Sequence, residues 1–206
     1  MQIIRSFLTA LVVASSSAAV HAGALDELNA FVSQTKSARA NFSQTVIGRN
    51  GKVTQKASGT FASQRPGKFR FIYEKPYAQT IVGDGQKLWT WDKELNQVTI
   101  KPMTDALGAT PAALLTGDGS LERNFTLKDI GESDGLQWVE ATPKQQEAGF
   151  EKVRIGFKSG QPLAMQVRDN FAQTTLLQFS SFERNVKFDA ADFHFTPPKG
   201  ADVVGE

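Results

Sequence analysis

The sequence predicts a mainly β domain of the α+β class, in which one long antiparallel meander curls into a barrel or half-barrel. Apolar and polar residues alternate in most segments from residue 40 to residue 184, and this period of two is typical of strands. Short turn signals rich in Gly, Asp and Asn separate the segments. Only residues 102–123 interrupt the pattern at length. A sheet with so many strands protects its edges best by curling, which predicts the barrel.

The first 22 residues have the layout of a secretory signal peptide. A cationic residue, Arg5, precedes the apolar run Phe7–Val13, and small residues follow up to Ala22. The apolar run is too short to span a bilayer. We therefore expect cleavage after Ala22, export, and a mature chain of residues 23–206 that forms one domain.

The mature chain is expected to begin with an amphipathic helix and to continue as strands. The helix is indicated by apolar residues at helical spacing, namely Leu25, Leu28, Phe31 and Val32, whose stripe must pack on another element. From residue 40 the period changes to two, and the GRNGK segment at 48–52 is typical of a hairpin turn. The following strands are expected at residues 53–63, 67–74, 77–83, 86–92, 95–101, 124–131, 135–142, 150–158, 162–169 and 172–184, with a short final strand at 193–195.

The long interruption at 102–123 contains the signals of a short helix. Thr110 and Pro111 supply an N-cap and a good first helical residue, and Gly117 supplies a stop. The resulting helix, residues 111–116, is too short to be stable unless it packs on the sheet. A movable cover and a fixed plug that closes one end of the barrel both fit this pattern.

The charge of the chain argues against nucleic acid as a ligand. The 23 Lys and Arg residues nearly balance the 21 Asp and Glu residues, for a formal net charge of +2, which falls to about +1 when Arg5 leaves with the signal. A nucleic-acid-binding surface requires a much larger excess of cations.

The residues that usually carry catalysis or bind metals are scarce. No cysteine is present, which excludes disulfides, cysteine zinc sites and a lipidated N-terminal cysteine. His194 is the one histidine of the mature chain and has no recognisable catalytic or metal-binding partner. The GDG triplets at 83–85 and 117–119 lie in no calcium or phosphate motif and are interpreted as turns. We expect no catalytic group, no metal and no cofactor.

The segment RPGKFRFIY carries the strongest functional signal. Phe69, Phe71 and Tyr73 alternate with cationic and apolar residues, among them Lys68 and Arg70. Strand geometry therefore puts the aromatic side chains on one face and the cations on the other. A site for single-stranded nucleic acid needs aromatic and cationic side chains on the same face. The aromatic face is therefore either ordinary barrel core or the wall of a site for a hydrophobic ligand.

A second aromatic pair follows two strands later. Trp89 and Trp91 alternate within KLWTWD. If the strands lie side by side in a meander, these side chains are expected to extend the face of Phe69 and Phe71 into one continuous apolar wall.

Three segments, in this order, carry a family resemblance. They are RPGKFRFIYEKPYAQTIVGDGQKLWTWDKELNQVTI at 65–100, ALGATPAALL at 106–115 and FHFTPPKGADV at 193–203. Together they resemble the LolA family of periplasmic carriers of outer-membrane lipoproteins, over essentially the whole mature chain. The resemblance implies a strongly curved, incomplete antiparallel β-barrel, with an N-terminal helix and a short helical lid over an apolar cavity for acyl chains.

The resemblance also implies partners and a location. A monomeric carrier in the periplasm receives acylated lipoproteins from the LolCDE transporter of the inner membrane and passes them to LolB, the acceptor of the outer membrane. LolB shares the architecture but is anchored through an N-terminal cysteine. The absence of cysteine here makes the chain similar to the soluble carrier.

The resemblance further implies which residues form the site. The acyl-chain cavity is expected to be lined by Phe69, Phe71, Tyr73, Trp89, Trp91, Leu114 and Leu115. Arg65 matches the arginine latch of the family, since its five donors can tie the carbonyls at the end of the short helix to the barrel rim. The alternatives are a surface arginine after a turn and, for Phe69, a simple core residue.

A carrier of this kind needs no catalytic machinery. Each methylene of a buried acyl chain is worth about 0.8 kcal/mol, so a multiply acylated protein hardly ever leaves a membrane unaided. Two other functions remain open from the sequence: a periplasmic barrel that binds a small lipid or hydrophobic metabolite, and a hydrolase with an acyl-binding pocket.

Overall fold

The computed structural model describes residues 23–103, 111–116, 121–145 and 149–205. The predicted signal peptide, the predicted N-cap Thr110, the predicted stop Gly117 and the second GDG triplet lie outside these residues. Among the described residues, no helix is long and apolar enough to cross a membrane.

The described strands form a single sheet. They are β1 (Ser37–Ile47), β2 (Val53–Gln64), β3 (Lys68–Lys75), β4 (Gln79–Asp84), β5 (Lys87–Asp92), β6 (Gln97–Pro102), β7 (Phe125–Ser133), β8 (Leu136–Pro143), β9 (Phe150–Lys158), β10 (Gln161–Asp169), β11 (Thr174–Arg184) and β12 (Asp202–Gly205). Their order across the sheet is β12-β6-β5-β4-β3-β2-β1-β11-β10-β9-β8-β7. The β12–β6 pair is parallel, and the other neighbours are antiparallel.

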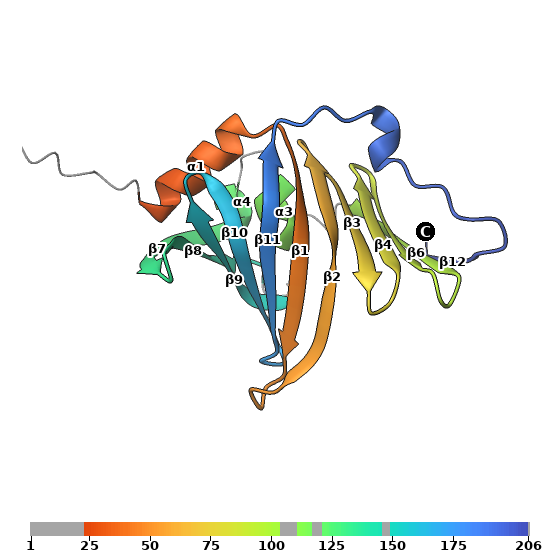
Figure 1. Cartoon of the computed structure of the whole chain (residues 1–206), viewed down its shortest axis with the longest axis horizontal. Coiled ribbons are helices and arrows are strands. Elements are labelled where there is room, and N and C mark those ends of the chain that lie inside the picture. Colours follow the sequence, from red (N-terminus) through yellow and green to blue (C-terminus); the bar gives the residue numbers. More distant parts are fainter. Residues whose placement is uncertain (1–22, 104–110, 117–120, 146–148, 206) are drawn as a thin grey trace, which may run out of the picture.

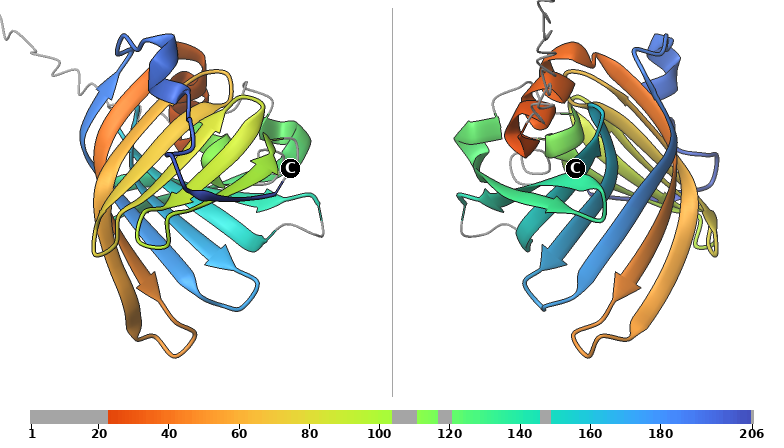
Figure 2. Two further views of the ribbon diagram at one scale, coloured as in Figure 1. Left: turned by 90° about the vertical axis from the view of Figure 1, so that its right-hand side faces the viewer. Right: turned by 60° about the vertical axis from the view of Figure 1, so that its left-hand side comes forward.

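The sheet is open and strongly curved. β7 and β12 lie at its two edges, and the strands between them wrap around the helices (Figures 1 and 2). The predicted incomplete antiparallel barrel is therefore confirmed. The hairpin predicted at 48–52 is present between β1 and β2, although β1 starts at Ser37, earlier than the alternation at residue 40 indicated.

In the described parts of the chain, three α-helices lie on the concave side of the sheet (Figure 2). They are α1 (Ala24–Gln34), α3 (Pro111–Thr116) and α4 (Leu121–Asn124). Helix α1 contacts β7, β8 and β9, whereas α3 contacts β2 and β3. The helices thus cover the hollow of the sheet from within, as a lid does.

Helix α1 is held by its apolar stripe and by its ends. Leu28 and Phe31 are fully buried in the interior, and each is worth roughly 1.5–3 kcal/mol of burial. The N–H of Ala24 donates to Asp129 Oδ2 of β7 at 2.7 Å, which satisfies one of the orphan donors at the start of the helix. The helix ends where the N–H of Thr35 donates to the carbonyl of Phe31 at 3.0 Å.

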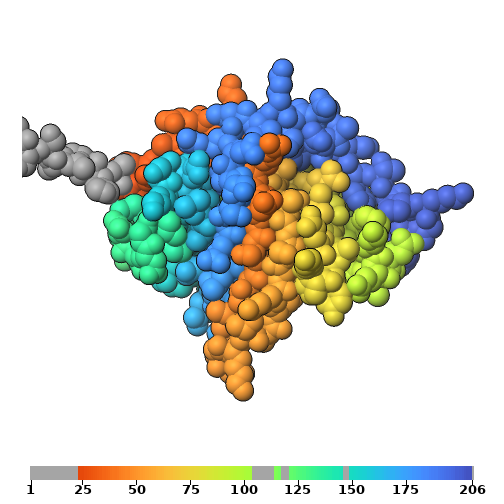
Figure 3. Space-filling model, viewed as in Figure 1, coloured from red at the N-terminus to blue at the C-terminus, as the bar shows by residue number. Residues whose placement is uncertain are grey.

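The segment after β11 crosses the outer face of the sheet. It contains the 3₁₀ helix η1 (Ala190–Phe193), which contacts β3 and β4, and the chain then returns to form β12. In Figure 3, which shows the outer face, this blue segment runs along the upper margin of strands β11, β1 and β2.

The strand predicted at 193–195 is wrong. Phe193 and Phe195 are buried and His194 is exposed, so the alternation is real, but the residues pack on the outer face without pairing into the sheet. The last strand comes later, at β12, whose residues are all exposed. Its pairing with β6 depends on the path of the whole C-terminal segment, and the residues of β12 carry no alternation that could reveal it.

Candidate functional site

The concave face of the sheet carries a continuous group of aromatic rings, which we call the aromatic wall. Its members come from β1, β2, β3 and β11 and are Phe42, Phe61, Phe69, Phe71, Tyr73 and Phe179. Phe61 and Phe71 lie directly opposite each other on β2 and β3, with ring centroids 4.7 Å apart. The rings of Phe42 and Tyr73 are 5.0 Å apart. These spacings are those of favourable aromatic pairs, so the wall is one packed surface.

The aromatic wall continues to helix α1. The rings of Phe179 and Phe182 on β11 are 6.3 Å apart, and Phe182 is 6.1 Å from Phe31 of the helix. Phe31 in turn lies 6.0 Å from Phe157 on β9. Aromatic contacts therefore run from β3 across the hollow to the opposite side of the barrel.

Helix α3 sits against this wall. Leu114 and Leu115 are 0% and 2% exposed and belong to the same interior cluster as the wall. The N–H of Gly67, just before β3, donates to the carbonyl of Thr116 at 2.9 Å. The short helix is thus attached to the sheet by buried side chains and by a backbone hydrogen bond at its C-terminal end.

Arg65 lies at the end of β2, beside both helices. Its Nε donates to the carbonyl of Thr35 at the end of α1, at 2.9 Å. Its guanidinium stands 5.3 Å from the ring centre of Phe31, a favourable cation–π arrangement. Burial lowers the pKa of Arg65 to about 10, which leaves it charged at neutral pH. This hydrogen bond from Arg65 to α1 was not predicted from the sequence. Two residues after Arg65, the N–H of Gly67 makes the backbone hydrogen bond to Thr116 of α3.

The expectation that the two tryptophans extend the aromatic wall is wrong. Register puts Trp89 opposite Val82, and Val82 opposite Arg70, so Trp89 shares the outer face with Arg70. The tryptophans pack there against Phe195, with ring centroids 5.8 and 6.2 Å away. Leu88 is the residue of KLWTWD that packs against the interior.

Phe69 is packed into the core in this closed arrangement. It is 4% exposed and lies across from Gly83 on β4. A Cβ added at Gly83 would lie 2.5 Å from Phe69 Cε1. Gly83 belongs to the first GDG triplet, which was interpreted as a turn; it also makes room for a ring of the aromatic wall.

Replacing Gly83 by alanine is expected to destabilise the protein by about 1–3 kcal/mol, because the buried ring of Phe69 must move. Urea denaturation would measure the change. Gly149→Ala is a suitable control, since a Cβ at Gly149 meets no atom within 4 Å. A loss at Gly83 no larger than that at Gly149 would contradict this account of the packing.

A recess of about 490 Å³ opens where the aromatic wall reaches the β3–β4 and β5–β6 hairpins, and we call it the lower recess. Its lining includes Gln44, Gln55, Tyr73 and Gln79, the charged residues Lys75, Asp92 and Glu94, and the exposed Tyr77 and Leu95. The hydroxyl of Tyr73 donates to Gln44 Oε1 at 3.0 Å. Tyr73 is thus shared between the apolar wall and a polar opening.

Burial raises the pKa of Tyr73 from its ordinary value near 10 to about 12. The folded protein therefore resists ionisation of this phenol, and stability that is complete below pH 10 is expected to fall as the pH rises from 10 to 12. Tyr73→Phe should remove this component of the loss. Denaturation midpoints of both proteins across that range would test it, and identical slopes would contradict it.

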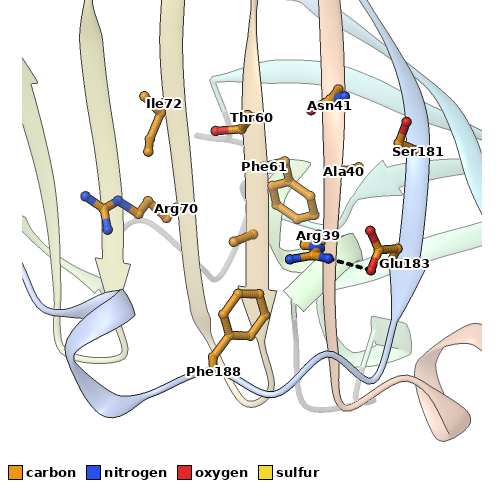
Figure 4. Close-up of a pocket in the computed structure, with 11 residues that line it drawn as sticks. Arg39, Ala40, Asn41, Thr60, Phe61, Arg70, Ile72, Ser181, Glu183 and Phe188 are labelled. Atoms are coloured by element: carbon orange, nitrogen blue, oxygen red, sulfur yellow. Dashed lines mark hydrogen bonds and ion pairs between the residues drawn. The ribbon is translucent and has the colours of Figure 1, made fainter.

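A second pocket, of about 300 Å³, lies on the outer face (Figure 4). Ala62 and Ile72 line it, Phe188 of the C-terminal segment bounds it, and the ion pair of Arg39 and Glu183, at 2.8 Å, borders it. Phe61 of the aromatic wall is also among the lining residues, although its side chain belongs to the interior cluster.

The described residues offer little acid–base or metal chemistry. No group of three His, Asp or Glu side chains among them could hold a metal ion. Asp84 is used by its turn: Oδ1 accepts hydrogen bonds from the N–H groups of Gln86 and Lys87, and Oδ2 accepts one from Trp89 Nε1. Although burial opposes ionisation, these hydrogen bonds hold the pKa of Asp84 below its ordinary value.

An open, curved sheet with helices seated on an aromatic concave face defines a LolA-like carrier fold. A solved LolA-superfamily protein from Nitrosomonas europaea has this fold, with a TM-score of 0.52 at 12% identity over 85% of this chain and 99% of that chain. Residues 33–196 match the family model described as outer membrane lipoprotein carrier protein LolA.

Close relatives in sequence agree with the match. The chain is 52% identical over its whole length to the outer-membrane lipoprotein carrier protein of Dechloromonas aromatica, covering 99% of that protein. It is 48% identical to the protein of the same name from Cupriavidus necator, with 98% of each chain covered. The chain belongs to the LolA family of outer membrane lipoprotein carrier proteins.

Proposed function

We propose that this protein is a periplasmic carrier that shields the acyl chains of lipoproteins released from the inner membrane and delivers them to an acceptor at the outer membrane. The observation that carries the proposal is the aromatic wall on the concave face, covered by a six-residue helix. Family membership supports it. The LolCDE transporter would supply the lipoprotein and LolB would accept it, with the carrier acting as a monomer.

The structure supports a lid that ligand can displace. Helix α3 is too short to persist by itself, so its position depends on Leu114, Leu115 and the hydrogen bond from Gly67 to Thr116. Acyl chains compete for the same apolar surface, and each buried methylene is worth about 0.8 kcal/mol. Burying a few methylenes can therefore replace the contacts of the two leucines.

In this mechanism the empty carrier is closed and the loaded carrier is open. Displacement of α3 exposes Phe69 and Phe71, which then line the acyl-chain site together with Tyr73. Arg65 stabilises the closed state through α1, as described above. Because the wall provides packing and few directional bonds, the ligand is held loosely enough to be passed on.

A release assay tests the proposal. Inner-membrane vesicles that carry radiolabelled lipoprotein and its transporter are incubated with residues 23–206 and ATP, beside an established carrier as positive control. A soluble complex of lipoprotein with this protein is the expected result. No complex, with the folded protein and a working control, would overturn the proposal; lipid bound without lipoprotein would favour the small-lipid alternative.

A further inference from the structure

The lower recess differs in chemistry from the aromatic wall that it adjoins. Three glutamines line it, Gln44, Gln55 and Gln79, together with the hydroxyl end of Tyr73. The charged residues Lys75, Asp92 and Glu94 also line it, and Asp92 lies directly opposite Gln79 in the β4–β5 pair. The recess is therefore a polar, hydrogen-bonding compartment at the end of an apolar surface.

The glutamine amides are available to a ligand. The hydroxyl of Tyr73 donates its hydrogen to Gln44 Oε1. The two N–H donors of the Gln44 amide make no hydrogen bond with the described residues. The side chains of Gln55 and Gln79 likewise make no hydrogen bond within the part of the chain that the structure describes. Asp92, by contrast, is engaged by the backbone N–H groups of Glu94 and Leu95 at 3.0 Å each.

Tyr73 connects the two environments. Its ring packs on Phe42 at 5.0 Å and on Phe71 at 6.5 Å, both in the aromatic wall. Its hydroxyl faces the glutamines. The concave face of β3 is therefore apolar at Phe71 and hydrogen-bonding at Tyr73, the next residue on the same face of the strand.

We propose that the lower recess is a subsite for the ester and amide carbonyls that join acyl chains to the lipid anchor, with the chains on the aromatic wall. Amide N–H donors suit neutral carbonyl oxygens, which accept hydrogen bonds and bear no charge. The apolar-to-polar order along β3 matches the order of groups in such an anchor. This subsite rests on the proposed function and adds to it: the recess sets how deeply the anchor enters.

The test compares two probes that differ only in their carbonyls: dioctanoylglycerol, which has ester carbonyls, and its ether analogue dioctylglycerol, which has none. Both displace a fluorescent apolar dye from the protein. The wild type is expected to bind the ester about tenfold more tightly, the factor for one or two net hydrogen bonds. The Gln44→Met, Tyr73→Phe double variant should lose this preference, because its affinity for the ester falls to that for the ether.

Gln178→Met is the matched control, because Gln178 is exposed on β11, and it should retain the preference. If the double variant fails to fold, Gln79→Met alone should lower the preference at least twofold. Equal binding of both probes to the wild type, or a preference that survives these variants, would overturn the subsite while leaving an acyl-binding carrier. Binding of neither probe would overturn the proposed function together with the subsite.

Discussion

Replacing Arg65 by leucine is expected to slow delivery of lipoprotein to the acceptor by roughly 10- to 100-fold, while the protein still folds and still takes up its ligand. In the closed state Arg65 donates to the carbonyl of Thr35 and stands over the ring of Phe31. A hydrogen bond made by a charged donor contributes about 1.5–3 kcal/mol. Ligand binding must overcome this stabilisation of the empty, closed state. When the Arg65 contact is lost, the carrier therefore binds lipoprotein more tightly by roughly the same 10- to 100-fold and releases it more slowly.

Transfer from a preloaded carrier to the acceptor, followed over time, is the measurement for this variant. Arg49→Leu serves as the control, because Arg49 is exposed in the β1–β2 hairpin and should not affect transfer. Arg65→Lys keeps the charge but loses the planar fork and should fall between the two. Transfer by Arg65→Leu at the wild-type rate would show that Arg65 is no latch.

Replacing Phe31 by alanine is expected to give the largest loss of stability, about 3–5 kcal/mol. Phe31 is 1% exposed, and its ring meets Phe157, Phe182 and the guanidinium of Arg65. Without this ring, α1 loses its aromatic contacts with Phe157 on β9 and with Phe182 on β11, and a cavity remains in their place. Since α1 contacts β7, β8 and β9, this loss should weaken the cover of the concave face as a whole.

Urea denaturation at neutral pH measures this loss. Phe171→Ala is the matched control: Phe171 is 84% exposed in the β10–β11 hairpin, and its replacement should change stability by less than about 0.5 kcal/mol. Similar losses in the two variants would mean that α1 is not part of the cooperative core. Uptake of lipoprotein by Phe31→Ala is measured at urea concentrations well below its unfolding transition. This measurement shows whether the variant still binds ligand when it is folded.

The sequence determined those features that depend on neighbours along the chain. The helical spacing of Leu28 and Phe31 identified α1 and its buried stripe, and the alternation in RPGKFRFIY correctly put Phe69 and Phe71 on one face. The GRNGK turn and the large number of strands predicted the hairpins and the curved sheet. In each case the signal is a local period set by backbone geometry, which requires no knowledge of the partner element.

The tertiary structure decided which faces meet. The alternation of Trp89 and Trp91 was read correctly, but their side depends on the register between β4 and β5, and a shift of one residue reverses every side chain. The partners of Arg65, the pairing of β12 with β6 and the glutamines of the lower recess all join segments distant in sequence. Such contacts follow from the path of the whole chain, because pairing and packing over long separations leave no period in the residues that make them.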